Sequence, residues 1–195
     1  INLAAVNPEI LKKSINLLIK EMDLADSIGS DYVVLHTGSA SLNSAANARK
    51  TAINALQEIN SLGKWKAQLL LENTAGERGD ISSRMEDIAE IIDKTDGKII
   101  GGACIDTCHA FAAGYDLTKE EGLSELADEI RKYIGTENLK LVHLKDSKKG
   151  RGSHVDRHEH IVEGELGLEG LRNFVRHPSF AGIPLILETP KKEED

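Results

Sequence analysis

The chain has 195 residues, 40% of them hydrophobic and 29% charged, a composition typical of a single globular domain over residues 1–195. A formal net charge of −8 gives no overall basic surface for nucleic acid, and no apolar run approaches the roughly 20 residues of a membrane span. The first residues lack the basic start and apolar centre of a signal peptide, so we expect a cytoplasmic protein. Cys104 and Cys108 are accordingly predicted to be reduced thiols.

The predicted elements alternate between helix and strand along the whole chain. Residues 1–9 look like the end of a strand and its loop, and Asn7 followed by Pro8 predicts a helix to about Ile28. Apolar residues at helical spacing predict further helices at residues 44–62, 83–95, 118–135 and 168–177. Short apolar runs predict strands at residues 31–36, 66–72, 98–106, 139–144 and 183–188. This alternation indicates parallel βαβ units, and the continuous apolar runs indicate strands that are covered on both faces.

Each predicted strand carries, at its last or next-to-last position, a residue of a type that binds metal ions. In chain order these residues are His36, Glu72, Asp106, His143 and Glu188. The carboxyl ends of parallel strands share one rim, so the five side chains are expected around a common centre. Taken singly, each residue also fits a hydrogen-bonded core histidine or a capping carboxylate. Together they would form a buried group of mutually repelling carboxylates without a counter-ion, which favours metal binding.

The strand ends also decide between two parallel architectures. A doubly wound sheet collects its ligand at one switch point, whereas a closed barrel brings all of its strand ends together. A complete (β/α)8 barrel takes about 250 residues, more than this chain has. We therefore predict an α/β fold of the TIM (β/α)8 type, incomplete here, with about five full parallel strands and the end of one more. It is expected to lack its N-terminal strands and the C-terminal helix that would begin at residues 191–195.

Three more candidate ligands are expected at the same rim. His109 follows Asp106 by three residues, and Asp156 and His158 lie in the long polar loop after the fourth predicted strand. Histidines and carboxylates without cysteine suit zinc, manganese or iron(II), and eight ligands are too many for one tetrahedral ion. We therefore expect more than one metal ion, bound by His36, Glu72, Asp106, His109, His143, Asp156, His158 and Glu188.

The polar loop is also rich in basic residues, namely Lys145, Lys148, Lys149, Arg151 and Arg157. A solvated loop and a phosphate-contacting loop both fit this pattern. Metal ions would return positive charge to the acidic rim, which weakens the charge argument against nucleic acid. The remaining histidines, His154, His160 and His177, are assigned to solvent or to loop packing.

Six segments of the chain resemble, in order, the signature segments of endonuclease IV, the zinc-dependent apurinic/apyrimidinic endonucleases of base-excision repair, also called AP endonuclease family 2. They are LHTGS, LLLENTAGE, CIDTCHAFAAGYD, HLKDSK, VDRHEHIVEGELG and GIPLILETP. The resemblance implies a (β/α)8 barrel with up to three Zn²⁺ ions at its carboxyl rim, for which Mn²⁺ is an alternative. Carried over by motif, the first ion would be bound by His36 and Glu72. Glu72 would bridge to a second ion bound by Asp106, His143 and Glu188, and the third would be bound by His109, Asp156 and His158.

The resemblance further implies the reaction and the partner. The chain would hydrolyse the phosphodiester 5′ to an abasic site in duplex DNA, leaving a 3′-hydroxyl and a 5′-deoxyribose phosphate. Glu72 as the bridging carboxylate and Glu188 as the group that orients or deprotonates water are the catalytic candidates. The basic loop would contact the DNA backbone, and we expect a monomeric intact domain that does not associate with membranes.

Two alternatives remain open from the sequence. A sugar isomerase or epimerase on a related barrel would use Glu72, Asp106, His143 and Glu188, but would give His109, Asp156 and His158 no role. Two or fewer metal ions per intact chain would favour that enzyme. A non-catalytic metal-binding fragment is the other alternative, since an incomplete barrel exposes two unpaired strand edges.

Overall fold

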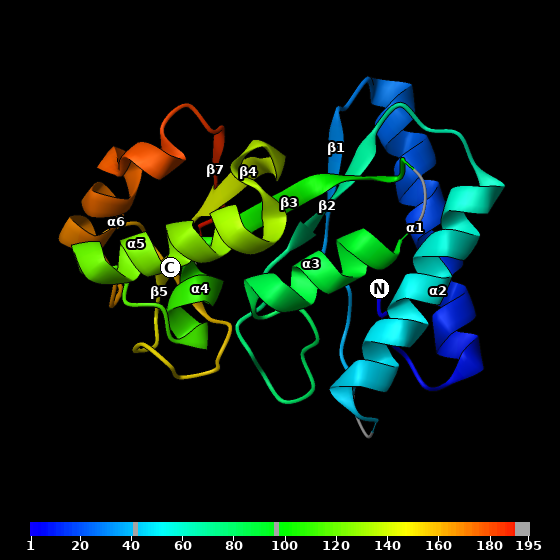
Figure 1. Cartoon of the computed structure of the whole chain (residues 1–195), viewed down its shortest axis with the longest axis horizontal. Coiled ribbons are helices and arrows are strands. Elements are labelled where there is room, and N and C mark those ends of the chain that lie inside the picture. The colour runs from blue at the N-terminus through cyan, green and yellow to red at the C-terminus, as the bar shows by residue number, and fades with distance from the viewer. Residues whose placement is uncertain (41–42, 96–97, 190–195) are drawn as a thin grey trace, which may run out of the picture.

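The computed structural model describes residues 1–40, 43–95 and 98–189, and its centre is one sheet of five parallel strands (Figure 1). The strands, in their order across the sheet, are β1 (Tyr32–Leu35), β2 (Gln68–Glu72), β3 (Ile100–Asp106), β4 (Leu139–Leu144) and β7 (Leu185–Leu187). Strand order across the sheet therefore follows chain order without a reversal. A doubly wound sheet reverses its order at a switch point, so the predicted TIM-type, incomplete barrel is confirmed.

Helices connect successive strands, and five of the six described α-helices begin within two residues of a predicted start, whereas the short helix Thr107–Ala113 was not predicted. The α-helices are α1 (Pro8–Ile28), α2 (Ala45–Leu62), α3 (Met85–Lys94), α4 (Thr107–Ala113), α5 (Glu120–Glu129) and α6 (Gly167–Arg176). The predicted helix at 118–135 is α5 followed by a π-helical turn, η1 (Ile130–Ile134), closed by a hydrogen bond from Gly135 N to Ile130 O. Two short 3-10 turns are η2 (Thr136–Asn138) and η3 (Pro178–Phe180). None of the described helices combines the length and the hydrophobicity that crossing a membrane requires.

The two faces of the sheet are covered unequally. Alternate strand residues point to opposite faces, and Leu69, Leu71 and Ile105 pack with the helices in the main core. The other face carries a small cluster built on Leu70, Cys104 and Leu141, against which Tyr32 and Val34 pack. Both faces of the sheet are therefore covered, as predicted. Helices cover the outer face, and a small apolar cluster covers the inner face, as in the wall of a barrel.

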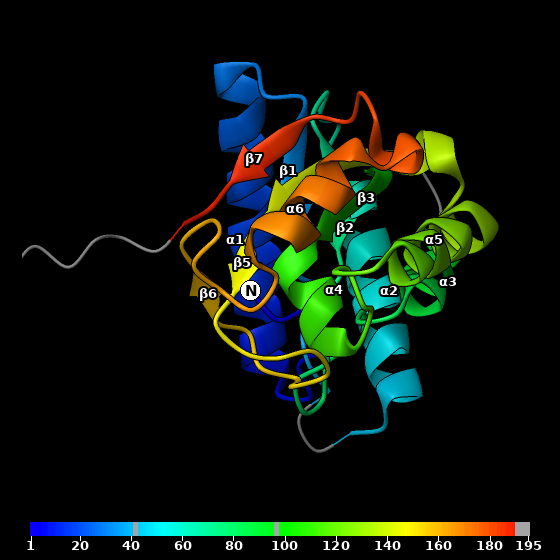
Figure 2. The same ribbon diagram turned by 90° about the vertical axis from the view of Figure 1, so that its left-hand side faces the viewer.

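The loop after β4 carries a two-stranded antiparallel hairpin of β5 (Asp146–Ser147) and β6 (His158–Glu159). Figure 2 shows this hairpin near the carboxyl end of β7, and one cleft is lined by Asp156, His158 and Glu188. The hairpin therefore folds the polar loop back over the rim of the sheet.

The margins of the sheet differ from the prediction in two respects. Residues 1–7 form turns rather than the end of a strand, although Leu3 N donates to Thr37 O beside the end of β1 at 3.1 Å. β7 is shorter than the predicted strand at 183–188, and its three apolar side chains are exposed. In the described chain, β1 and β7 are the outer strands of the sheet, in line with the predicted unpaired edges. The expected helix start at 191–195 lies outside the described residues.

We predict that Gly102→Ala destabilises the sheet. Gly102 has φ +147°, beside an irregularity in the β3–β4 register, and a Cβ there would clash with the carbonyl oxygen of Asn138. Strain and displacement of the backbone together should lower the free energy of unfolding by about 2 to 4 kcal/mol, measured by urea denaturation. Gly150→Ala is the control, because nothing lies near its Cβ position, and it should change stability by less than about 1 kcal/mol. Equal effects of the two substitutions would contradict this account.

Candidate metal centre

The structure brings all eight predicted ligand residues together at the carboxyl rim of the sheet. A cleft of about 460 Å³ is lined by seven of them, and Asp106 lies fully buried beneath it. The strands explain this convergence, since Asp106 and His143 are paired in the β3–β4 register and Glu72 ends the neighbouring strand. The ligands in the cleft wall are His36, Glu72, His109, His143, Asp156, His158 and Glu188.

Glu72 is the centre of one group of contacts. Its Oε2 lies 2.9 Å from His36 Nε2, and its Oε1 lies 2.8 Å from His143 Nδ1. Burial alone would raise the pKa of the Glu72 carboxyl, but the imidazoles of His143 and His36 hold that pKa well below its usual range. Glu72 is therefore an ionised carboxylate whose two oxygens face two different partners.

His109 is oriented by a buried backbone contact. The side chain of Asp106 caps the start of α4 by accepting a hydrogen bond from His109 N at 2.8 Å. His109 Nδ1 lies 2.9 Å from the carbonyl oxygen of Asn73, which can only accept, so Nδ1 carries the proton and Nε2 is left facing the cleft. Asn73 is itself fixed, because its side chain exchanges two hydrogen bonds with the backbone of Asp106.

Asp156 lies between two imidazoles. Its carboxylate oxygens lie 3.2 Å from His109 Nε2 and 3.1 Å from His158 Nε2. These two imidazoles hold the pKa of Asp156 far below its usual value. Burial would lower the pKa of the His109 imidazole, but the carboxylates of Asp156 and Asp106 raise that pKa to about 9. Without metal, His109 is therefore protonated at neutral pH, and it must release a proton before it can bind a metal ion.

The loop that carries Asp156 and His158 is anchored by a neighbour of the rim. Asp146 is fully buried, and its carboxylate accepts hydrogen bonds from the backbone of Ser147, Gly164, Leu166 and Gly167, at 2.8 to 3.2 Å for the shortest bond to each. Both ends of the loop are thereby tied to one side chain. Sequence reasoning did not single out Asp146, although an acidic residue just after a strand is a usual cap for a following turn.

The prediction that Lys145 contacts phosphate from an exposed loop is wrong, because this lysine is buried. Its side chain is 3% exposed, and its Nζ lies 2.7 Å from Asp106 Oδ2 and 2.5 Å from Glu188 Oε2. Thr107 holds its backbone by a pair of hydrogen bonds, one with Lys145 N and one with Lys145 O. The ammonium is buried because Asp106 requires a counter-ion there. Lys148, Lys149, Arg151 and Arg157 are exposed, as the prediction requires.

The donor set fits divalent metal ions. Two buried ligand atoms in the described structure, Asp106 Oδ2 and His109 Nε2, lie 2.7 Å from Lys145 Nζ and 3.2 Å from Asp156 Oδ2, but neither makes a hydrogen bond of good geometry. Buried polar atoms without a partner are costly and signal a missing ion or water. His36, Glu72 and His109 place three donor atoms within 4.8 Å of one another, as do Asp106, His109 and His158. Nitrogen and oxygen donors at such spacing suit zinc or manganese.

The two cysteines are poorer ligands, although both lie near the cluster. Both thiols are free and buried, as the sequence predicts. Burial raises the pKa of the Cys108 thiol to about 12 and that of Cys104 still further above its ordinary value. A thiol binds metal as the thiolate, so these residues favour packing over coordination. His177 also packs, against Phe180, as predicted for a histidine outside the cluster.

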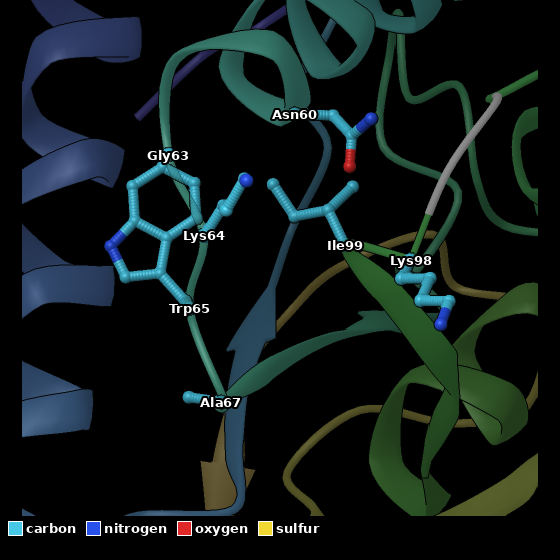
Figure 3. Close-up of a pocket in the computed structure, with 7 residues that line it drawn as sticks. All are labelled: Asn60, Gly63, Lys64, Trp65, Ala67, Lys98 and Ile99. Atoms are coloured by element: carbon cyan, nitrogen blue, oxygen red, sulfur yellow. The ribbon is translucent and has the colours of Figure 1, made fainter.

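A second cavity lies away from the rim, where β2 and β3 begin (Figure 3). Its volume is about 340 Å³, and the indole of Trp65 covers Gly63, where a Cβ would clash with the ring. Trp65 Nε1 donates to Asp23 at 2.7 Å, which fixes the ring. The lining, made of Asn60, Gly63, Lys64, Trp65, Ala67, Lys98 and Ile99, offers neither carboxylate nor imidazole. Among the described residues, every group of donor atoms close enough to hold a metal ion includes residues of the rim cleft.

Comparison with known proteins yields matches along nearly the whole chain. A family described as xylose isomerase-like TIM barrel matches residues 1–195. The chain is 44% identical over 191 residues to the probable endonuclease 4 of Halothermothrix orenii, covering 98% of this chain and 69% of that protein. It is 40% identical over 193 residues to the probable endonuclease 4 of Aquifex aeolicus, covering 98% and 68%. The chain thus spans about two thirds of the length of these relatives.

Solved structures agree with the sequence matches. The crystal structure of endonuclease IV from Thermus thermophilus superimposes with a TM-score of 0.81 at 34% identity, covering 98% of this chain and 66% of that one. A D-tagatose 3-epimerase-like protein superimposes with a TM-score of 0.73 at 22% identity, covering 96% and 66%. The second likeness shows the shared barrel fold alone.

We predict that Asp146→Ala loosens the ligand loop. The substitution leaves four backbone N–H groups without their acceptor and should cost about 3 kcal/mol or more of unfolding free energy, with faster amide exchange at Gly164 and Leu166. Asp128→Ala is the matched control, because Asp128 is exposed and pairs on the surface with Arg131. Its cost should stay below about 0.5 kcal/mol. Protected loop amides in the Asp146 variant would contradict the anchoring role.

We predict that the metal-free chain loses stability as pH rises from 6.5 to 9. The folded pKa of His109, about 9, exceeds its unfolded value near 6.5, so its contribution is complete below the unfolded value and is lost as pH rises through the folded one. Urea unfolding of EDTA-treated protein should show a loss of roughly 3 kcal/mol across this range. The loss should shrink in His109→Gln. A flat profile would rule out a protonated His109.

Proposed function

Because this chain belongs to the endonuclease IV family, we propose that it carries the metal centre of a nuclease that cleaves duplex DNA 5′ to abasic sites. Water would add to phosphorus and the bond to the upstream 3′-oxygen would break. The products are a 3′-hydroxyl and a 5′-deoxyribose phosphate. Family membership supports a DNA-repair endonuclease. We infer specificity for abasic sites from the resemblance of the sequence motifs to those of the family.

The clustering of four carboxylates in one cleft is the observation that carries the proposal. Glu72, Asp106, Asp156 and Glu188 approach one another with Lys145 as the one lysine among them. Negative charge from these carboxylates opposes the entry of a DNA phosphate. Metal ions would reverse the sign of the field, so metal binding and phosphate binding are parts of the same function.

We divide the ligands among three ions, two of which share Glu72. We assign His36 and Glu72 to one ion, and His109, Asp156 and His158 to another. The remaining ion would be held by Glu72, Asp106, His143 and Glu188. Zn²⁺ is the proposed ion, with Mn²⁺ as an alternative for the same donor types. Bound ions would supply Lewis acidity, which acidifies water and neutralises charge on phosphate oxygens.

Glu72 and Glu188 have different proposed roles because their surroundings differ. Glu72 is buried, and its two oxygens face separate imidazoles, which suits a carboxylate that bridges two ligand groups. Glu188 is 49% exposed at the mouth of the cleft, where solvent and substrate enter. Burial would raise its pKa, but Lys145 holds that pKa below the usual value. Glu188 can therefore hydrogen-bond an attacking water and accept its proton.

The exposed basic residues of the loop suit the DNA backbone. Lys148, Lys149, Arg151 and Arg157 would position phosphates without reading sequence. Arg157 also lines a shallow hollow with Asp156 and Glu188 beside the cleft mouth. A nucleotide that lacks its base leaves the helical stack at low cost, which gives selectivity for the lesion.

The structure offers less support for a sugar isomerase or epimerase. Such an enzyme would leave His109, Asp156 and His158 without a role, yet these residues contact one another in the cleft. The count of bound ions separates the two functions: three per chain suits the nuclease, and two or fewer suits the isomerase.

We predict metal-dependent incision of an abasic duplex by the chain, tested in the longest form that its gene encodes. With Zn²⁺, the product should end in a 3′-hydroxyl that a polymerase extends, and EDTA should abolish it. Glu188→Gln should lower kcat by about 100-fold, whereas Glu169→Gln, at an exposed glutamate paired with Arg172, should leave kcat unchanged. Absence of incision by the zinc-loaded protein, or equal incision of an undamaged duplex, would refute the proposal.

A further inference from the structure

A lysine lies among the ligands of the centre, where a metal-binding site ordinarily excludes positive charge. The Nζ of Lys145 contacts Asp106 Oδ2, Glu188 Oε2 and, at 3.4 Å, His158 Nε2. Three of the eight proposed ligands therefore contact the ammonium. The contact with Asp106 is buried, so solvent screens it only weakly.

Asp106 has only one carboxylate oxygen available for both the ammonium and a metal ion. Its Oδ1 already accepts the hydrogen bond from His109 N, which caps α4, so Oδ2 is the oxygen that remains for a metal ion. Nζ lies 2.7 Å from that same oxygen. A zinc ion coordinates a carboxylate oxygen at about 2 Å, and two cations at such spacing in a buried site repel strongly.

We propose that Lys145 is an internal counter-ion that competes with a divalent metal ion for Asp106 and Glu188. In the metal-free chain the ammonium neutralises these carboxylates and keeps the rim folded. When an ion binds the pair, the ammonium leaves toward the mouth of the cleft, beside the half-exposed Glu188. The long, flexible lysine stem permits this movement without displacement of the backbone, which Thr107 holds.

Competition has two consequences of opposite sign. Removing the ammonium should strengthen binding of the ion that uses Asp106 and Glu188, because nothing has to be expelled. The same removal should weaken the metal-free fold, because Asp106 is fully buried and loses its counter-ion. A lysine that merely supported the site would weaken both metal binding and the fold when removed.

The test compares Lys145→Met with Lys148→Met, which removes the same charge from an exposed lysine whose surface partner is Glu159, at 3.8 Å. Zinc affinity is measured by competition with a chromophoric chelator, and the stability of EDTA-treated protein by urea unfolding. In Lys145→Met, at least one zinc ion should bind about tenfold tighter or more, and the urea midpoint of the metal-free protein should fall. Lys148→Met should leave both close to the parent values. Unchanged or weaker zinc binding in Lys145→Met would overturn the proposal.

A second measurement uses the unaltered chain, in case Lys145→Met does not fold. Reductive methylation mapped by mass spectrometry should find Lys145 protected in EDTA and reactive in saturating zinc, with Lys148 reactive in both. Continued protection of Lys145 in zinc would show that the ammonium stays in place, and would overturn the competition. The proposal rests on the metal-binding role above: a chain that binds no zinc refutes both, whereas zinc binding that is independent of Lys145 refutes the competition alone.

Discussion

Electrostatic repulsion among four carboxylates is the constraint on which the rest of this site depends. Parallel strands that end at one rim bring Glu72, Asp106 and Glu188 together, and the loop hairpin adds Asp156. Each carboxylate is met by an imidazole or an ammonium within hydrogen-bonding or ion-pairing distance. These partners compensate the charge only in part, so the cleft is poised to take up cations. Metal affinity thus follows from the fold, because the barrel places like charges side by side.

Much of this arrangement could be predicted from the sequence because strand ends are easy to locate. Apolar runs that stop at His36 and Glu72 mark both the strand and the rim. Parallel topology then requires that the marked residues converge, without any knowledge of side-chain conformation. The order of the strands across the sheet, which follows chain order, was predictable for the same reason.

Asp156 and His158 of the long loop were predicted as ligands, but the positions of its basic residues could not be predicted, because the loop has no periodicity. Lys145 and Lys148 look alike in the sequence, yet one is buried against Asp106 and the other is exposed. The direction of each side chain depends on hydrogen bonds from Thr107 and on the hairpin, which form only in the folded chain. Asp146 was missed for a related reason, since three of its four partners are backbone groups about 20 residues further along.

The position of Glu188 has a consequence for how ions move in and out. This carboxylate follows β7, a three-residue outer strand that in the described chain is paired with β4, whereas Glu72 and Asp106 end strands in the middle of the sheet. The three apolar side chains of β7 are exposed, and segments with few buried contacts open at lower free energy than buried strands. Fraying of β7 would withdraw Glu188, which is both a proposed metal ligand and a partner of the Lys145 ammonium. The inner ligands would keep their positions. Exchange of an ion with solvent can then proceed through a local opening at one wall, with the barrel core intact.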